Sequence, residues 1–322
     1  MDSWSATDGL AHLNLRDKHL PYKGIIGDVL LDKNPAVKTV INKIDDVGEE
    51  NEYRTFKYEV LAGPDDLNVE IREADCTFRF DYAKVYWNSR LNTEHERIVE
   101  MFRKGDAVCD VMAGIGPFAV PAGRKRVFVW ANDLNPDSYT SLVDAIHRNK
   151  VSQFVRPFNV DGHEFIRQAT SGLLRNQHSA QIQPMKKKRH DRQKPGLGPQ
   201  TAEHMVMEQP KFFSHYVMNL PATALQFLPS FIGLYGDPED QELLPPNLQM
   251  PMIHVHCFST KSGDNEAEKL KICHEISKLL LHVITPETPE TTIWDVRDVA
   301  PNKRMFCASF RLPEEVAFRL RR

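Results

Sequence analysis

The chain has 322 residues, of which 41 are Lys or Arg and 44 are Asp or Glu, so its formal net charge is −3. Hydrophobic residues make up 41% and charged residues 26%, which is typical of a globular protein and excludes a disordered or fibrous chain. No stretch approaches the roughly 18 consecutive apolar residues that cross a bilayer, and the first residues resemble neither a secretory signal nor an arginine-rich presequence. We therefore expect about two domains that fold in an intracellular aqueous compartment.

The cysteines argue against a disulfide framework and against a zinc knuckle. They are odd in number, widely separated and never arranged as CxxC. We expect them to be small buried packing residues, and we expect no metal site. The five are Cys76, Cys109, Cys257, Cys273 and Cys307.

The first 80 residues predict a short tail followed by a small mixed domain. We expect residues 1–10 to form the tail and residues 11–80 to form a small α/β domain. Three apolar runs within it are rich in β-branched and aromatic residues, which favour strands. The predicted strands are Gly24–Leu31, Val37–Ile44 and Tyr53–Ala62.

From Asp81 onward, short strand-like runs alternate with helical patterns. Such alternation is typical of an α/β domain with a largely parallel, doubly wound sheet, here covering residues 81–322. The predicted strands are Ala107–Met112, Val127–Ala131, Phe154–Val160, Tyr216–Leu220 and Ile253–Phe258. The predicted helices are Glu94–Phe102, Pro136–Asn149, His163–Leu174 and Glu266–Leu281.

A basic insertion interrupts this domain at about residues 173–209. Residues 171–200 carry a net charge of +6, so the rest of the chain carries −9. Few residues in this stretch are apolar, and it ends in Pro and Gly, which favours a solvated flexible loop over a dedicated phosphate-binding or nuclear-import element.

Ligands of doubly wound sheets bind beyond the carboxyl ends of the strands, so the residues that follow each predicted strand are the candidate site. Asp133, at the end of the second predicted strand, follows Asp110 at about the spacing at which a carboxylate binds ribose hydroxyls. The third glycine of a dinucleotide-binding motif is missing, which favours a nucleoside without a pyrophosphate. The candidate residues are Asp110, Gly114, Gly116, Asp133, Asp161, Gly162 and Asn219.

Simpler interpretations of the polar residues stay open at this point. Asp133 and Asp161 both precede predicted helices and could be their N-caps. Asn219 precedes Leu-Pro and could be a turn residue.

Three motifs carry a resemblance to a known family. DVMAGIGPF (Asp110–Phe118), NDLNP (Asn132–Pro136) and MNLPA (Met218–Ala222) resemble the class I S-adenosylmethionine-dependent methyltransferases. Within that class, DYAKVYWNSRLNTEHERI (Asp81–Ile98) and YRTFKYEVLAG (Tyr53–Gly63) resemble the eukaryotic and archaeal tRNA (guanine-37 N1)-methyltransferases.

The resemblance extends from about His12 to the C-terminus and has two departures. Met112 stands where family members commonly have Phe. The family's N-terminal tRNA-reading domain is expected to be absent, because the chain begins near the start of the family's middle domain.

The resemblance implies a Rossmann-like class I methyltransferase domain, preceded by a smaller α+β domain that faces RNA. It implies methylation of N1 of guanosine 37 in cytoplasmic and mitochondrial tRNAs, which in phenylalanine tRNA is the first step towards wybutosine. It also implies S-adenosyl-L-methionine as cofactor, tRNA as partner, no membrane partner and a monomer. The implied locations are cytoplasm, nucleus and mitochondrial matrix.

Roles for the catalytic residues follow from the resemblance. Glu94 would be the general base for the N1 proton, and Arg54 would stabilise negative charge on guanine O6. Arg90 would lie near the reacting base, and Asn219 and Pro221 would hold the extruded guanine. The sequence alone favours a different role for Glu94, an acid of a helix first turn beside a capping box of Thr93 and Glu96, and the resemblance reverses that preference. Tyr86 is expected to be a core residue.

The resemblance assigns the cofactor to residues that follow the strands and begin the helices. Asp133 would accept the ribose hydroxyls, Asp161 the adenine amino group, and Gly162 would flank the ring. Both loop glycines would pass under the methionine moiety, and Asp110 would orient their loop. The full set is His95, Asp110, Gly114, Gly116, Asp133, Leu134, Asp161, Gly162 and Asn219.

Basic residues near this edge of the sheet are expected to meet RNA phosphates. They are Lys84, Arg90, Arg97, Lys104, Arg124, Lys125 and Arg126, with Lys186–Lys194 as a helper. Two alternatives remain open. One is the aminocarboxypropyl transferase of wybutosine synthesis, which uses the same cofactor, and the other is a catalytically silent RNA-binding module.

Overall fold

The computed structural model describes residues 3–44, 53, 55–182, 205–246, 248–260, 262 and 264–320. Two expectations fall outside these residues, the O6-stabilising role of Arg54 and the basic run Lys186–Lys194. Among the described residues, no helix is both long and apolar enough to cross a membrane.

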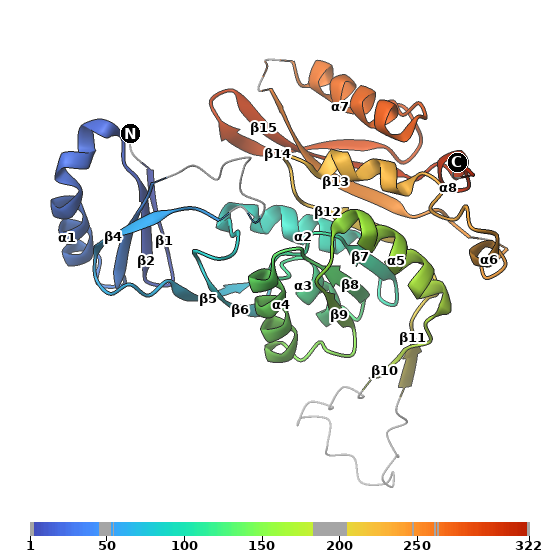
Figure 1. Ribbon diagram of the computed structural model, residues 1–322, viewed down its shortest axis with the longest axis horizontal. Helices are drawn as coiled ribbons and strands as arrows, with labels where there is room; N and C mark the ends of the chain where they lie inside the picture. The colour runs from blue at the N-terminus through green and yellow to red at the C-terminus, as the bar shows by residue number, and fades with distance from the viewer. Residues whose placement is uncertain are drawn as a thin grey trace, which may run out of the picture.

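A small four-stranded sheet forms one end of the molecule (Figure 1). Its strands, β1 (Ser3–Thr7), β2 (Leu10–Asn14), β3 (Thr39–Lys43) and β4 (Tyr58–Ala62), lie in the order β1-β2-β3-β4. Strands β2 and β3 are parallel, and the other two pairs are antiparallel. Residues 3–7, expected as part of a tail, form the edge strand of this sheet.

The connection between β2 and β3 corrects one predicted strand. Gly24–Leu31 lies inside a helix, α1 (Lys23–Lys33), which follows the 3-10 helix η1 (Asp17–Tyr22). Ile26 and Leu30, one helical turn apart, pack against the small sheet, while Ile25 is 67% exposed. Burial of one helical face against the sheet therefore outweighs the strand preference of the β-branched residues.

A hairpin connects the small sheet to the rest of the chain. Strands β5 (Asn68–Glu73) and β6 (Cys76–Asp81) are joined by Ala74 and Asp75, both with positive φ as a tight hairpin turn requires. The side chain of Asn149 holds the hairpin, because its Oδ1 accepts from Thr77 N at 2.9 Å and its Nδ2 donates to Thr77 O at 2.8 Å.

The larger part of the chain contains a seven-stranded sheet in the order β14-β15-β13-β12-β7-β8-β9 (Figure 1). Strands β7 to β9, β12 and β13 are parallel, and β15 lies antiparallel between β13 and β14. The chain runs outward from β7 through β8 to β9 and returns to the other side of β7 with β12. This reversal makes the carboxyl ends of β7 and β12 the expected place for a ligand. The strands are β7 (Ala107–Asp110), β8 (Phe128–Asn132), β9 (Val155–Phe158), β12 (His215–Met218), β13 (Met252–Thr260), β14 (Thr292–Ala300) and β15 (Lys303–Arg311).

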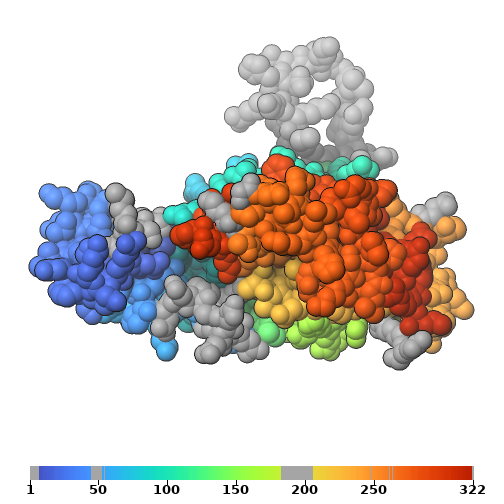
Figure 2. Space-filling view, turned by 90° about the horizontal axis from the view of Figure 1, so that it is seen from above, coloured from blue at the N-terminus to red at the C-terminus, as the bar shows by residue number. Residues whose placement is uncertain are grey.

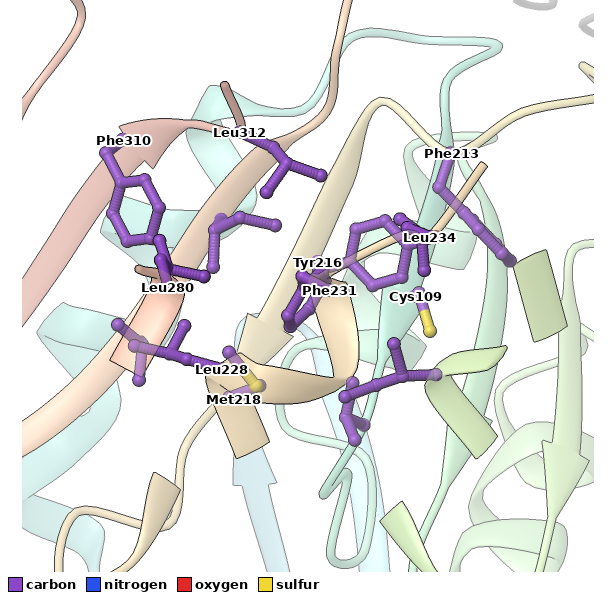
Figure 3. Packing of buried hydrophobic residues seen from close by; sticks show 14 of the residues in the cluster. Cys109, Phe213, Tyr216, Met218, Leu228, Phe231, Leu234, Leu280, Phe310 and Leu312 are labelled. Atoms are coloured by element: carbon purple, nitrogen blue, oxygen red, sulfur yellow. The ribbon is translucent and has the colours of Figure 1, made fainter. Parts of the chain in front are cut away.

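Helices cover both faces of this sheet. One face packs against α2 (Asn92–Met101), α3 (Ala119–Arg124) and α4 (Pro136–Arg148), and the core there continues into the β5–β6 hairpin. The other face packs against α5 (Gly162–Arg175), η4 (Ala224–Phe231) and α7 (Asn265–Leu280). In Figure 3, Leu228 and Phe231 of η4 lie against Tyr216 and Met218 of β12. Figure 2 looks onto α7 and the C-terminal strands, with the small sheet at one end.

The five predicted strands and four predicted helices of residues 81–322 all form, with ends that shift by a few residues. Not predicted were α3, η4, the hairpin β14–β15 and two short helices, α6 (Pro238–Gln241) and α8 (Glu314–Ala317). Strands β10 (Ser179–Ile182) and β11 (Met205–Glu208) pair antiparallel at the two ends of the basic insertion. All five cysteines are buried, as expected.

Candidate cofactor and catalytic site

A pocket lies where the sheet topology places it, beyond the carboxyl ends of β7, β8 and β12. It brings together most of the candidate cofactor residues. Those that line it are Gly114, Asp133, Leu134, Asp161, Gly162 and Asn219, and they are joined by Tyr53, Tyr86, Val111, Met112, Asn132, Asn135, Ser138, Leu220 and Phe227.

Asp133 connects the ends of β7 and β8. Its Oδ2 accepts a hydrogen bond from Gly114 N at 2.8 Å, and its Oδ1 accepts one from Asn135 N at 3.0 Å. Burial raises the pKa of Asp133, although these bonds and one from Ser138 oppose the rise. Asp133 is not the cap of α4, because the Oδ1 of Asn135 accepts from Asp137 N. The capping alternative for Asp133 was therefore wrong.

Asp161 combines capping with a place in the pocket. Its Oδ1 accepts from His163 N at 2.9 Å and from Glu164 N at 3.1 Å, so it is the N-cap of α5. No hydrogen bond is found to Oδ2 among the described residues, so that oxygen can accept one from a ligand. Helix capping and ligand binding are thus compatible at this position.

Asn132 was missed by the sequence reasoning, although it lies within the quoted NDLNP motif. Its Nδ2 donates to Val111 O at 3.1 Å and to Val160 O at 2.9 Å, and its Oδ1 accepts from Val160 N at 2.9 Å. This 1% exposed side chain therefore fixes the segments after β7 and β9 to the end of β8.

The two loop glycines differ in what surrounds them. A Cβ at Gly114 would meet no atom within 4 Å, so this residue leaves open space in the pocket. A Cβ at Gly116 would lie 2.7 Å from Leu142 Cδ1, and its φ is +95°. Gly116 is buried and does not line the pocket, so of the two loop glycines only Gly114 borders the open space.

Two polar side chains near the pocket have oxygens without hydrogen-bond partners among the described residues. Asn219 lines the pocket with its buried Oδ1 unpaired. Asp110 is fully buried with both carboxyl oxygens unpaired, and burial, followed by the negative charge of Asp133, raises its pKa well above the ordinary value. The expected role of Asp110 in orienting the glycine loop therefore has no side-chain hydrogen bond behind it among the described residues.

Apolar side chains complete the pocket. Tyr86, expected in the core, is 45% exposed and lines it, as does Leu134, which is 40% exposed. Phe227 of η4 stacks on His163 with ring centroids 4.1 Å apart, and no local sequence signal indicated it. Tyr53 brings the small N-terminal domain to the same pocket.

Six expected site residues that the structure describes do not line this pocket: Asp110, Gly116, Glu94, Arg90, His95 and Pro221. His95 is buried, its Nδ1 lies 2.6 Å from Glu73 Oε1, and its ring contacts Phe118. The carbonyl of Pro221 accepts a hydrogen bond from Phe258 N at 3.1 Å, which joins the Asn219 loop to β13. His95 and Pro221 stabilise the surroundings of the pocket rather than lining it.

Glu94 is enclosed by cations. It is 4% exposed, and Arg97 donates to both of its oxygens, from Nε to Oε2 at 2.6 Å and from Nη2 to Oε1 at 2.7 Å. His256 Nε2 lies 2.7 Å from Oε1. Burial alone would raise the pKa of Glu94, but the bonds from Arg97 and His256 lower it to about 2.

The alternative interpretation of Glu94 is confirmed in one part and wrong in the other. The N-cap of α2 is Leu91, which makes no side-chain cap, and the proposed capping box of Thr93 and Glu96 does not form. Glu94 is the acid in the first turn of α2, as that alternative expected, and its side chain is buried.

His256 was missed, and a sequence signal for it existed. Two histidines, His254 and His256, alternate with apolar residues in the predicted buried strand, so they share one face of β13. Glu94, His256 and Cys307 also form the single set of three possible metal ligands among the described residues, with ligand atoms within 4.8 Å of one another. The 2.7 Å between Glu94 and His256 suits a shared proton.

Four of the basic residues expected near the site lie at the opposite edge of the sheet. Lys104, Arg124, Lys125 and Arg126 precede β7 or β8, and Gly105 N donates to Arg126 O beside the start of β7. Amino ends and carboxyl ends of parallel strands lie on opposite edges, so these four residues face away from the pocket.

The strand order, the antiparallel strand β15 between β13 and β14, and the pocket beside β7 define a class I methyltransferase fold. Solved structures share it. Trm5b from Pyrococcus abyssi aligns with a TM-score of 0.63 and 23% identity, covering 96% of this chain and 74% of that one. Pyrococcus horikoshii TYW2 in complex with MeSAdo aligns with a TM-score of 0.58 and 20% identity, covering 96% and 90%.

Sequence comparison then gives the family. A model of the TRM5/TYW2 methyltransferase domain matches residues 69–179. A tRNA (guanine(37)-N(1))-methyltransferase of Fusarium vanettenii is 55% identical over 318 residues, which are 97% of this chain and 67% of the relative. A protein of that name from Schizosaccharomyces pombe is 47% identical over 318 residues, covering 98% and 69%. The chain belongs to the TRM5/TYW2 methyltransferase family.

The N-terminal region of the chain has a family match of its own. A model of the TYW2 N-terminal domain matches residues 1–66. The chain spans about two thirds of the length of these curated relatives. The expected absence of an N-terminal tRNA-reading domain is not confirmed by these matches.

Proposed function

We propose that this chain transfers a methyl group from S-adenosylmethionine to N1 of guanosine 37 in tRNA. The observation that carries the proposal is a nucleoside-type pocket beside an enclosed carboxylate. Asn219 lines the pocket, and the preceding residue, Met218, contacts His256, the partner of Glu94. The names of the relatives that are 47% and 55% identical support this substrate.

The residues of the pocket fit the cofactor. Asp133 and Asp161 offer carboxylate lone pairs for hydroxyl and amino groups, and the unpaired Oδ1 of Asn219 can accept from an ammonium group. The open side of Gly114 leaves room for a chain to pass. Leu134, Tyr86 and Phe227 supply apolar surface for a ring.

S-adenosylmethionine, when bound, supplies an electrophilic methyl group. The protein must then remove the N1 proton of guanine, because N1 is protonated and weakly nucleophilic at neutral pH. Glu94 takes this proton while the bond from N1 to the methyl carbon forms and the sulfur–carbon bond breaks. Asn219 and the neighbouring loop hold the base. Arg54 would meet the negative charge that develops on O6.

The enclosed state of Glu94 sets a condition on this reaction. Arg97 occupies both carboxylate oxygens, so guanine reaches Glu94 only after Arg97 withdraws. Withdrawal also removes one of the charges that lower the pKa of Glu94, which makes it a stronger base. Arg97 stacks over the exposed ring of Trp294 at 5.1 Å, so it lies where an RNA phosphate could attract it.

The experiment is methyl transfer from labelled S-adenosylmethionine to unmodified tRNA that bears guanosine 37, with tRNA bearing adenosine 37 as control. The proposal expects label in N1-methylguanosine and none in the adenosine control. Glu94→Gln should lower the rate by about 10²–10⁴-fold, with donor affinity retained. Glu96→Gln, exposed on the same helix, is the matched control.

Two outcomes would point elsewhere. The match of residues 1–66 to a TYW2 N-terminal domain keeps an aminocarboxypropyl transferase as second candidate. If the chain has that activity, the nucleoside gains the mass of an aminocarboxypropyl group instead of a methyl group, and only on tRNA that is already methylated. Donor binding without any transfer would indicate a silent RNA-binding module.

The remaining assignments are part of the same proposal. Residues 11–80 face the RNA, the protein acts as a monomer without a metal, and it works in cytoplasm, nucleus and mitochondrial matrix. Crosslinking to tRNA tests whether residues 11–80 face the RNA, and light scattering tests the monomer. Activity in the presence of a chelator tests the absence of a metal, and imaging of the tagged protein tests its location.

A further inference from the structure

His256 lies behind Glu94 with its two ring nitrogens in different surroundings. Its Nε2 is 2.7 Å from Glu94 Oε1, and its Nδ1 is 3.4 Å from the carbonyl oxygen of Met218. A carbonyl oxygen only accepts hydrogen bonds, so Nδ1 carries a hydrogen and donates it to Met218. The other ring nitrogen, Nε2, faces the carboxylate of Glu94. His256 thereby joins α2, which carries Glu94, to the end of β12, which is followed by Asn219.

The two cationic partners of Glu94 differ in their freedom to move. The side chain of His256 is 0% exposed, whereas that of Arg97 is 18% exposed. His256 contacts only Oε1, but Arg97 occupies both oxygens. When Arg97 leaves, Oε1 remains held and Oε2 becomes available.

The charges around His256 favour its protonated form. Burial lowers the pKa of His256, but Cys307 on β15 and Glu94 on α2 raise it to about 10. Asp110 on β7 also interacts electrostatically with His256, and burial and neighbouring cations hold His254, on the same strand as His256, neutral. The Arg97 guanidinium, which donates to Glu94 Oε1, is the other charged group at this carboxylate.

We propose that His256 is the positioning residue of the general base. It holds Glu94 through Oε1 after Arg97 withdraws, so that Oε2 alone faces N1 of guanine. The N1 proton passes to Oε2, and His256 neither gains nor loses a proton. This role rests on the proposed methyl transfer, because His256 orients Glu94 and keeps Glu94 ionised for that reaction.

The role predicts a change in pH dependence that simple loss of packing would not cause. Glu94 acts as a base only while ionised, so activity is present above its pKa and lost as the pH falls through it. Removal of the His256 cation raises the pKa of Glu94. The acid limb of the rate profile should therefore move to higher pH in a His256 variant.

The test compares His256→Phe and His256→Gln with His254→Gln, which changes an equally buried histidine on the same face of β13 that does not contact Glu94. At saturating donor we expect both His256 variants to lose about 10–100-fold in kcat near pH 6, and less near pH 8.5. His256→Gln keeps a donor and should lose less than His256→Phe. The KM for the donor should stay unchanged, and the His254→Gln profile should parallel that of the unaltered protein.

A second measurement does not depend on activity, and its main readout uses the unaltered protein. Ring ¹⁵N spectra of the unaltered protein should show His256 protonated up to a pH of about 10, and Glu94→Gln should lower that midpoint. A midpoint near the ordinary value of 6.5, or parallel pH profiles for His256→Phe and the unaltered protein, would overturn the proposal.

The two proposals fail in different ways. If the unaltered protein does not methylate guanosine 37, the proposed function fails, while the spectra still report whether the ion pair forms. If methylation proceeds and depends on Glu94 but not on His256, the function stands and the positioning role is wrong.

Discussion

The carboxylate of Asp133 and the backbone amide of Gly114 are joined by a hydrogen bond of 2.8 Å across the ends of two neighbouring strands. The bond connects the residue expected to bind the ribose with the loop expected to bind the methionine part of the cofactor. A single side chain therefore orders two sides of the pocket, and its loss should affect both.

Asp133→Asn should weaken S-adenosylmethionine binding by about 10–100-fold, because charge-assisted hydrogen bonds are each worth about 1.5–3 kcal/mol. Isothermal titration calorimetry measures the affinity. Asp137→Asn, an exposed acid in the first turn of α4, is the control and should bind normally. Equal affinities for the two variants would remove Asp133 from the binding site.

Gly114→Ala should mainly weaken donor binding, whereas Gly116→Ala should mainly lower stability. Ala at position 116 would clash with Leu142 and Val120 in a backbone of positive φ, so we expect a loss of about 2–4 kcal/mol in the free energy of unfolding. Ala at position 114 meets no neighbour, so stability should fall by only about 1–2 kcal/mol, while donor affinity falls because the methyl group enters the pocket. Urea denaturation and calorimetry separate the two. If donor affinity falls in Gly116→Ala but not in Gly114→Ala, then Gly116 rather than Gly114 borders the cofactor.

Arg90 and Arg297 should contact RNA together. Burial, followed by the positive charge of Arg90, lowers the pKa of Arg297, so these cations lie near one another and near Tyr86 of the pocket. Either Ala variant should weaken tRNA binding and reduce the slope of log affinity against log salt by about 1. Lys104→Ala, at the opposite edge of the sheet, should leave the slope unchanged. A filter-binding salt series measures it, and equal slopes for all three variants would contradict the prediction.

Stability should fall in mild acid because of His12. Burial, followed by the cations Lys43 and Arg90, lowers the pKa of His12 to about 4. Below pH 6.5 the unfolded chain binds a proton that the folded chain does not, so stability is full above 6.5 and is lost as the pH falls towards 4. The loss is at most about 3 kcal/mol. His12→Gln should flatten the pH dependence of urea denaturation, and an unchanged curve would show that other groups dominate.

Local pattern was sufficient for five strands and four helices of the methyltransferase domain, but not for α3, η4 or the β14–β15 hairpin. Alternation of apolar strands with amphipathic helices predicted the strands β7, β8, β9, β12 and β13 and the helices α2, α4, α5 and α7, because each periodicity reports one buried face. The same reasoning was wrong for α1, because its short apolar run suits a strand or a helix and the small sheet decides between them.

The sequence by itself determined which polar residues follow the strands, and the sheet topology then brought Asp133, Asp161 and Asn219 to one pocket. Only the tertiary structure decided the state of Glu94, because His256 lies 162 positions away in the chain and meets it through packing of β13 on α2. Electrostatic interactions depend on distance in space rather than along the chain, so no local pattern could show that this carboxylate is enclosed by two cations.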